Sequence, residues 1–195
     1  MLFRSVSTGY DEYVVDCTTT TGKATRWTNG YGGPIKYPDM RENDSKALTY
    51  TTQPLEYGVE ITGHPVLHLW VKSPTSDLDF YAYLEEVDGE GYSHYLSEGV
   101  IRISHRALSE PPYEYMGLPY HRSHREDVLP LIDEPVELVY DLLPISNVFD
   151  EGHRIRLTLA CADKDNYENR DVSGTIATVH RNKKHYSHIS LPIIH

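Results

Sequence analysis

The sequence is poor in cysteine and in long apolar stretches. Its 195 residues include only two cysteines, Cys17 and Cys161. Cysteines so far apart form neither a disulfide framework nor a zinc-binding spacing, so we expect two reduced, buried thiols. No apolar run approaches the ~20 residues that span a bilayer, and residues 1–6 lack the apolar core of a signal peptide. These features predict a cytoplasmic protein without a membrane partner.

Positive charge is also scarce. Lysine and arginine together number 18, against 29 aspartates and glutamates, which leaves a formal net charge of −11. Such acidity opposes binding to nucleic acid or to anionic lipid, so neither is expected as a partner. Hydrophobic residues make up 39% of the chain and charged residues 24%, as in globular proteins. A chain of this length can form a core without disulfides or metal.

Long amphipathic helices are missing too, because no stretch of ten or more residues has the required apolar periodicity. Alternation with a period of two, typical of strands, recurs instead. Residues 154–159 are the clearest case, and their apolar side chains are predicted to face a core: Ile155, Leu157 and Leu159. The side chains between and before them are predicted to face water: Arg154, Arg156 and Thr158.

Other runs extend the strand pattern. The alternating ones are residues 57–61, 101–104 and 136–142. Residues 66–71 and 80–84 are more continuously apolar, as expected of central strands covered on both faces or of strands at a sheet–sheet interface. Turn-forming residues separate the runs about every ten residues, and Asp88–Gly91 predicts a hairpin. Roughly ten short strands predict an all-β fold, either a two-sheet sandwich or a jelly roll.

Two segments fit the strand pattern less well. Residues 1–47 are predicted to form an extended N-terminal arm or linker, and residues 48–195 the β-sandwich domain. Residues 108–135 contain five prolines. A long proline-rich loop in a compact domain is often a contact surface, and we expect one here.

Catalytic motifs are absent or incomplete. The nucleophile elbow of α/β-hydrolases is Gly-x-Ser-x-Gly at a strand-to-helix turn. Ser93 and Ser97 each have one of the two required glycines, and both lie in the expected hairpin. The sequence therefore predicts no catalytic residue.

Metal-binding patterns fail as well. Closely spaced histidines occur as three pairs: His64 and His68, His121 and His124, and His185 and His188. Chelation at i, i+4 needs a helix, but the first pair brackets a strand-like run in which four residues span about 13 Å. Asp163–Glu168 resembles the start of a calcium loop, but Tyr167 occupies its fifth position and no glycine follows. We expect a polar turn there, and neither a metal nor a cofactor.

An ordered series of short motifs resembles a known family. The series consists of Gln53–Leu55, Glu60–Val66, Leu69–Val71, Asp77–Phe80, Leu84–Asp88, Glu98–Arg102, Asp141–Pro144 and Gly152–Leu157. It is similar to the C-terminal domain of the X-Pro dipeptidyl-peptidase and cocaine-esterase (CocE/NonD) group of serine hydrolases. The resemblance covers about residues 48–193.

The resemblance implies a jelly-roll domain of galactose-binding-like type that packs on an α/β-hydrolase domain. That domain, in the same parent chain or a separate one, supplies the Ser-His-Asp triad for hydrolysis of esters, amides or X-Pro peptides. Because this chain has no room for the triad, no catalytic residue carries over, and the chain alone is expected to be inactive. A homo-oligomer stays open. At the start of the Asp-x-Asp-Phe strand, Leu78 and Phe80 are implied to contact the partner domain and to line the path of substrate.

Two alternatives stay open beside this interpretation. The first is a stand-alone carbohydrate-binding jelly-roll module, which the tyrosines of one loop suggest: Tyr113, Tyr115 and Tyr120. The second is an independent hydrolase with a non-standard site on the sandwich.

Overall fold

The regular structure of the chain is almost entirely antiparallel β-sheet. The computed structural model describes residues 9–28, 32–73, 76–168 and 171–194. Helical turns in these residues are short, namely α1 (Arg41–Asp44) and the 3₁₀ turns η1 (Ile103–His105) and η2 (Arg125–Asp127). The predicted all-β class is confirmed, and none of these helices is long and apolar enough to cross a membrane.

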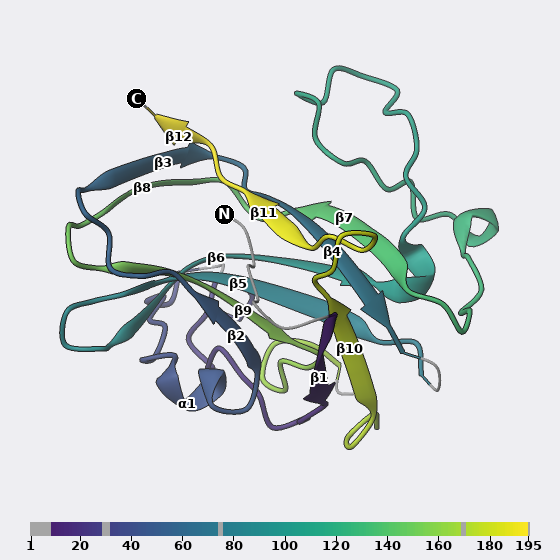
Figure 1. The fold of residues 1–195 in the computed structure, drawn as a ribbon, viewed down its shortest axis with the longest axis horizontal. Helices are drawn as coiled ribbons and strands as arrows, with labels where there is room; N and C mark the ends of the chain where they lie inside the picture. The colour runs from purple at the N-terminus through teal and green to yellow at the C-terminus, as the bar shows by residue number, and fades with distance from the viewer. Residues whose placement is uncertain (1–8, 29–31, 74–75, 169–170, 195) are drawn as a thin grey trace.

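Three sheets make up the molecule (Figure 1). Sheet A contains β1 (Tyr10–Val14), β10 (Ile176–His180), β4 (Val66–Lys72), β11 (His188–Ser190) and β7 (Val136–Asp141). Sheet B has the order β2 (Leu48–Thr51), β9 (Arg154–Ala160), β5 (Asp79–Val87) and β6 (Ser93–Arg102). Sheet C has the order β12 (Ile193–Ile194), β3 (Val59–Gly63) and β8 (Ile145–Phe149).

Strand β4 is the centre of sheet A. It pairs with β7 along one edge, and with β10 and β11 in succession along the other. Its side chains alternate between buried and half-buried positions, so β4 is covered on one face only. Strand β5, by contrast, pairs with β6 and β9 and is buried along nearly its whole length.

The main core lies between sheets A and B. Sheet A contributes Leu67, Leu69, Val71, Leu138, Tyr140, Ala177 and Val179. Sheet B contributes Phe80, Ala82, Leu84, Ile101, Ile155, Leu157 and Leu159. The predicted inward alternation of residues 154–159 is therefore confirmed for its apolar members. Burial of such side chains is the dominant stabilising contribution in a fold of this size.

The prediction that Thr158 faces water is wrong, because its side chain is completely buried. The outer face of sheet B lies under a cover made by residues 19–28, 32–44 and 163–167, which pack on it around Met40 and Tyr167. Hydrogen bonds tie the two parts of this cover together, as from the Thr21 hydroxyl to Asp163 at 2.6 Å. An alternating strand exposes its polar side chains only where nothing covers them.

The hairpin predicted at Asp88–Gly91 is confirmed, and it joins β5 to β6. Its register changes once, between Leu84, which pairs with Ser97, and Glu85, which pairs with Tyr95. Leu96 is the extra residue of this β-bulge. As a result Tyr95 and Glu98, an odd number of positions apart, both lie on the outer face of sheet B.

Segments outside the central strands complete the fold. Within residues 1–47, the described part contributes strand β1 and helix α1, and the domain boundary at residue 47 stays a prediction. The long connection between β6 and β7, residues 103–135, leaves the sheets and projects to the upper right of Figure 1. Cys161 carries a buried free thiol.

Candidate functional site

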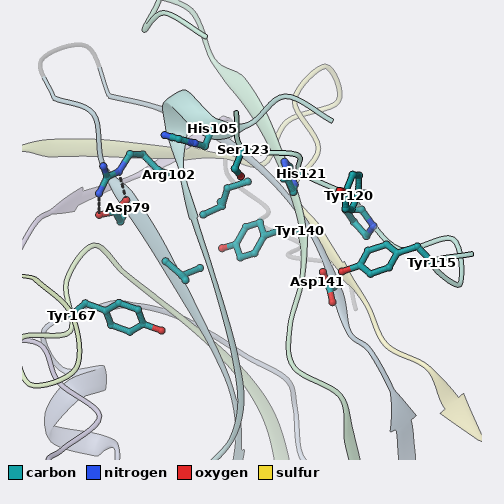
Figure 2. A pocket seen from close by; sticks show the side chains of 13 residues that line it. Asp79, Arg102, His105, Tyr115, Tyr120, His121, Ser123, Tyr140, Asp141 and Tyr167 are labelled. Carbon is teal, nitrogen blue, oxygen red and sulfur yellow. Dashed lines mark hydrogen bonds and ion pairs between the residues drawn. The ribbon is translucent and has the colours of Figure 1, made fainter. Parts of the chain in front are cut away.

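Two adjoining cavities lie where the long connection meets strands β5, β6 and β7. The first, of about 570 Å³, runs from Tyr167 across the strands to the tyrosines of the loop (Figure 2). The second, of about 230 Å³, shares Val100, Asp141 and Tyr167 with the first. Its remaining walls are Trp27, Tyr81, Glu98, Gly99 and Leu143. Both cavities therefore depend on segments far apart in the sequence.

A close approach of β6 and β7 fixes the junction of the two cavities. A Cβ built on Gly99 would lie 2.6 Å from the carbonyl oxygen of Asp141, so a larger residue would push the strands apart. The backbone N–H of Leu143 donates to the carbonyl of Glu98 at 2.9 Å. The Ser97 hydroxyl donates to the carbonyl of Leu143 at 2.5 Å. These contacts hold Glu98 and Asp141 beside one another.

An ion pair borders one side of the first cavity. Arg102 donates from Nε to Asp79 Oδ1 at 2.7 Å, and from a terminal nitrogen to Oδ2 at 2.9 Å. The two residues face each other directly across β5 and β6. This fork raises the pKa of Arg102 above its ordinary value. Because each charge is matched by the other, the pair shapes the wall and leaves little unpaired charge for a ligand.

The proline-rich segment forms the opposite side of the first cavity. Tyr113, Tyr115 and Tyr120 contact one another edge to face, with ring centroids 5.6 to 6.0 Å apart. His121 anchors the segment: its Nδ1 lies 3.0 Å from the Ala107 carbonyl and its Nε2 lies 2.8 Å from that of Val139. A neutral imidazole can donate to only one of these oxygens, and an imidazolium to both. The loop is therefore tied to β7.

Glu98 is the most unusual group of the second cavity. Only 4% of this residue is exposed. Its Oε1 accepts a hydrogen bond from Nε1 of Trp27, and its Oε2 is buried with no hydrogen-bond partner among the described residues. Burial raises the pKa of Glu98, although the Trp27 bond and the nearby Arg26 guanidinium oppose that shift. A buried, half-satisfied carboxylate is costly unless something compensates it.

Aromatic rings surround this carboxylate. Trp27 and Tyr167 meet edge to face with centroids 5.9 Å apart, and Tyr167 lies 4.9 Å from Tyr81. Burial raises the pKa of both tyrosines, so their hydroxyls stay neutral near pH 7. The cavity combines aromatic surface with two acidic side chains, Glu98 and Asp141. No lysine or arginine lines it in the described part of the chain.

The structure places both residues that the family resemblance singled out in the main core. Leu78 and Phe80 are each 1% exposed, so neither offers surface of its own in this chain. Their neighbours do reach the boundary: Asp79 lines the first cavity, and Asp77 accepts hydrogen bonds from the backbone and hydroxyl of Ser104. The role of Leu78 and Phe80 in substrate access stays a prediction.

The serines of the partial nucleophile motifs have no catalytic surroundings. The Ser93 hydroxyl donates to buried Glu85 at 3.0 Å, and that of Ser97 donates to a carbonyl. A nucleophilic serine needs a neighbouring base such as histidine, and neither hydroxyl bonds to one.

The metal-binding candidates are placed equally clearly. The described residues contain no group of three or more histidine, cysteine or acidic side chains able to hold a metal ion. Asp163, in the calcium-like segment, instead bonds to Thr21 and Asn166. The segment is a polar turn that fastens the cover of sheet B.

Sequence reasoning missed the second cavity. Glu98 and Tyr167 were noticed for other reasons, within a family motif and a failed calcium loop. Trp27 lies in a polar stretch without periodicity, so no local sequence pattern marks it as a site residue. Glu98 and Tyr167 lie 71 and 140 positions from Trp27 along the chain. Only long-range pairing brings them together, and no local pattern encodes it.

Comparison with known proteins gives a consistent set of similarities. A family model described as the X-Pro dipeptidyl-peptidase C-terminal non-catalytic domain matches residues 7–190. A Mycobacterium bovis protein described as a serine esterase is 43% identical over 191 residues, covering 95% of this chain and 30% of that protein. The cocaine esterase of Rhodococcus sp. is 32% identical over 180 residues, covering 85% of this chain and 28% of that protein. The chain thus spans less than a third of the length of these relatives.

Solved structures share the fold. An α-amino acid ester hydrolase superposes with a TM-score of 0.71 at 21% identity, over 98% of this chain and 33% of that one. A CocE/NonD family hydrolase from Staphylococcus aureus gives 0.69 at 19% identity, over 98% of this chain and 34% of that one. At these identities the likeness establishes the architecture alone.

Proposed function

Because the chain belongs to the X-Pro dipeptidyl-peptidase C-terminal non-catalytic domain family, we propose that it packs on an α/β-hydrolase domain and shapes substrate access to it. The carrying observation is the match of a non-catalytic domain to nearly the whole chain, while relatives named as esterases are about three times longer. The catalytic triad then belongs to the partner domain, in the same parent chain or a separate one. Ester hydrolysis is the activity we propose for the assembled protein.

The face that carries the two cavities is our candidate for the contact. The long connection beside it exposes several large apolar side chains: Leu108, Tyr113, Met116, Val128, Leu129 and Ile132. Such a concentration on one loop favours an interaction surface. Leu78 and Phe80, buried beneath this face, would act by supporting Asp77 and Asp79 and thereby the wall of the first cavity.

The finer architecture is also a proposal. We propose that sheets A and B form a jelly roll of galactose-binding-like type within residues 48–195, with residues 1–47 as the segment that joins it to the catalytic domain. The packing of two antiparallel sheets around one core supports this. The cytoplasmic location and the homo-oligomer stay predictions.

A domain exchange with the mycobacterial relative tests the proposed function. The segment of that esterase matching this chain is deleted in one variant and replaced by this chain in another. Hydrolysis of p-nitrophenyl acetate is then measured for both and for this chain alone. We expect little activity from the deletion variant, recovery in the exchange, and background rates from the chain alone. A folded exchange variant no more active than the deletion, or turnover by the chain alone, would contradict the proposal.

The carbohydrate-binding alternative rests on the three loop tyrosines. Tyr113, Tyr115 and Tyr120 pack edge to face on one another, whereas sugar stacking needs flat, accessible ring faces. Their arrangement therefore gives this alternative less support. Calorimetric titration of the chain against a glycan panel addresses it, and we expect no heat of binding.

A further inference from the structure

The second cavity contains a charge imbalance that the fold does not resolve. Glu98 is only 4% exposed, yet just one of its two carboxylate oxygens accepts a hydrogen bond. Asp141, whose Oδ2 lies 3.0 Å from Nδ1 of His64, lines the same cavity, and no lysine or arginine among the described residues does. A buried acceptor without a donor destabilises the fold, because its lost hydrogen bonds to water are not replaced. A group that brought a positive charge and an N–H donor would relieve this cost.

The walls of the cavity suit a cation with an organic body. Tyr167 contacts the two other aromatic rings of the cavity, with its centroid 5.9 Å from that of Trp27 and 4.9 Å from that of Tyr81. Aromatic faces attract cations through their quadrupole, and attract ammonium groups especially when water is excluded. A metal ion would instead need several oxygen ligands. The volume of about 230 Å³ is below the roughly 300–1,000 Å³ of pockets for drug-sized ligands, so the ligand must be small.

We propose that this cavity binds a small organic ammonium ion that carries at least one N–H. The ammonium pairs with the carboxylate of Glu98, which lines the cavity, and the rings of Trp27, Tyr81 and Tyr167 border the charged end and its carbon substituent. Asp141, at the junction with the first cavity, adds negative potential at the entrance. Binding is tested on this chain alone, so a failure of this proposal can be distinguished from a failure of the proposed docking on a catalytic domain.

The chain's own groups define the rival arrangement. The Arg26 guanidinium lies over the Tyr95 ring, 5.7 Å from its centroid. It interacts electrostatically with Glu98 but does not line the cavity. The Tyr95 hydroxyl is buried and makes no hydrogen bond of standard geometry in the described residues, but it lies close enough to the Glu98 carboxylate to help lower its pKa. A rotation of Tyr95 could satisfy Glu98 from inside the protein. Tyr95→Phe removes this rival and should leave ammonium binding at least as tight.

Protonation of Glu98 makes the affinity for an ammonium ion depend on pH. Burial raises the pKa of Glu98, and Asp163 acts in the same sense. The neighbouring tyrosines, Tyr81 and Tyr167, stay neutral near pH 7 because burial raises their pKa as well. An alkylammonium ion, like the lysine side chain with its pKa of about 10.4, stays charged throughout. Ammonium affinity should therefore rise as pH increases through the pKa of Glu98 and then level off.

The experiment compares benzylammonium with benzyl alcohol, its neutral counterpart, on the 195-residue chain. Trp70→Phe leaves Trp27 as the only tryptophan, so its fluorescence reports on the cavity, with calorimetry as the second measurement. We expect saturable binding of benzylammonium at pH 7.5 and about tenfold weaker binding of the alcohol. Glu98→Gln keeps the shape and the bond from Trp27, and should weaken ammonium binding about tenfold or more.

Two further variants complete the test. Glu137→Gln removes a carboxylate on β7 that pairs with His68 and does not line the cavity, so it should bind as the parent does. Tyr167→Leu removes one wall and should weaken binding without touching Glu98. The proposal is overturned if neither compound saturates, if the alcohol binds as tightly as the ammonium, or if Glu98→Gln binds like the parent.

Discussion

Sheets A and B are built from strands with the same alternating pattern, but their outer faces lie in opposite environments. The outer face of sheet B is buried under its cover, where Tyr83, Glu85 and Thr158 are at most 1% exposed. The outer face of sheet A is open, and its half-exposed rings contact one another. His68 stacks on His188 with centroids 4.5 Å apart, and Trp70 meets His185 at 4.7 Å.

The difference shows what a cover does to polar groups. Under the cover, Glu85 accepts bonds from Ser93 and Thr158, and burial together with nearby Asp44 raises its pKa far above the ordinary value. On the open face, water can complete the hydrogen bonding of each histidine. The polar side chains of the covered face are therefore held in one arrangement, and their burial carries an electrostatic cost. Those of the open face can be substituted more freely.

The largest contrast is expected from truncating one ring on each face. Tyr83→Ala removes a fully buried ring under the cover and should lower the free energy of unfolding by about 3–5 kcal/mol. Trp70→Ala removes a half-exposed ring on the open face and should cost about 1–2 kcal/mol. Urea denaturation of both variants measures this. Equal losses would show that the cover adds no burial energy.

A smaller effect should follow from breaking the ion pair beneath the cover. Arg156 donates to Asp44 at 2.5 Å, and the Asp44 side chain is 6% exposed. Arg156→Leu leaves Asp44 buried beside Glu85 without its partner, so we expect a loss of about 3 kcal/mol. The urea midpoint measures it, and Lys23→Leu, outside this network, serves as the control. A loss as small as that of the control would mean that water reaches Asp44.

Neutralising Glu85 should increase stability. Its folded pKa lies above the ordinary value of 4.5, so above about pH 4.5 the unfolded chain releases a proton that the folded chain keeps. The parent therefore loses stability as pH rises, and Glu85→Gln removes this loss, so its urea midpoint should exceed that of the parent at pH 7 and match it near pH 4. Urea midpoints from pH 4 to 8 test this, with exposed Glu60→Gln as the control. A pH-independent difference would count against it.

The smallest effect is expected on the open face. Burial, His185 and Lys72 lower the pKa of His180 below its ordinary 6.5. As pH falls below about 6.5, the unfolded chain gains a proton that the folded chain refuses, so this histidine makes the fold less stable in acid. His180→Phe keeps a ring beside Tyr10 and should reduce the fall in urea midpoint between pH 7.5 and 5.5. An unchanged slope would mean that His180 titrates normally.

The strand pattern predicted much of the fold because alternation is a local property of the chain. Residues 154–159 and the Asp88–Gly91 hairpin were assigned correctly for that reason. The end of strand β6 at Arg102 was not predicted, because residues 101–104 alternate like a strand although Ile103 begins η1. The cover over sheet B could not be predicted either, because Thr21 and Asp163 meet only in the folded chain.

The candidate site was predictable only in part. The family resemblance identified the region of Asp79, which lines the first cavity, but the two side chains it singled out, Leu78 and Phe80, are buried. Glu98 became notable through its missing hydrogen-bond partner. That property depends on the positions of Trp27 and Tyr95, and neither position follows from local sequence.

The single extra residue at Leu96 decides which chemistry the strand can offer. Removing it would shift residues 97–102 by one place against β5, and each of them would exchange the inner layer for the outer one. Glu98 would then point its carboxylate among aliphatic side chains, and Ile101 would point toward solvent. An acidic binding site at this position therefore requires that evolution keep the number of residues in β6 constant. A homologue that lost one residue here would have to replace the glutamate by an apolar residue or lose the pairing of this strand.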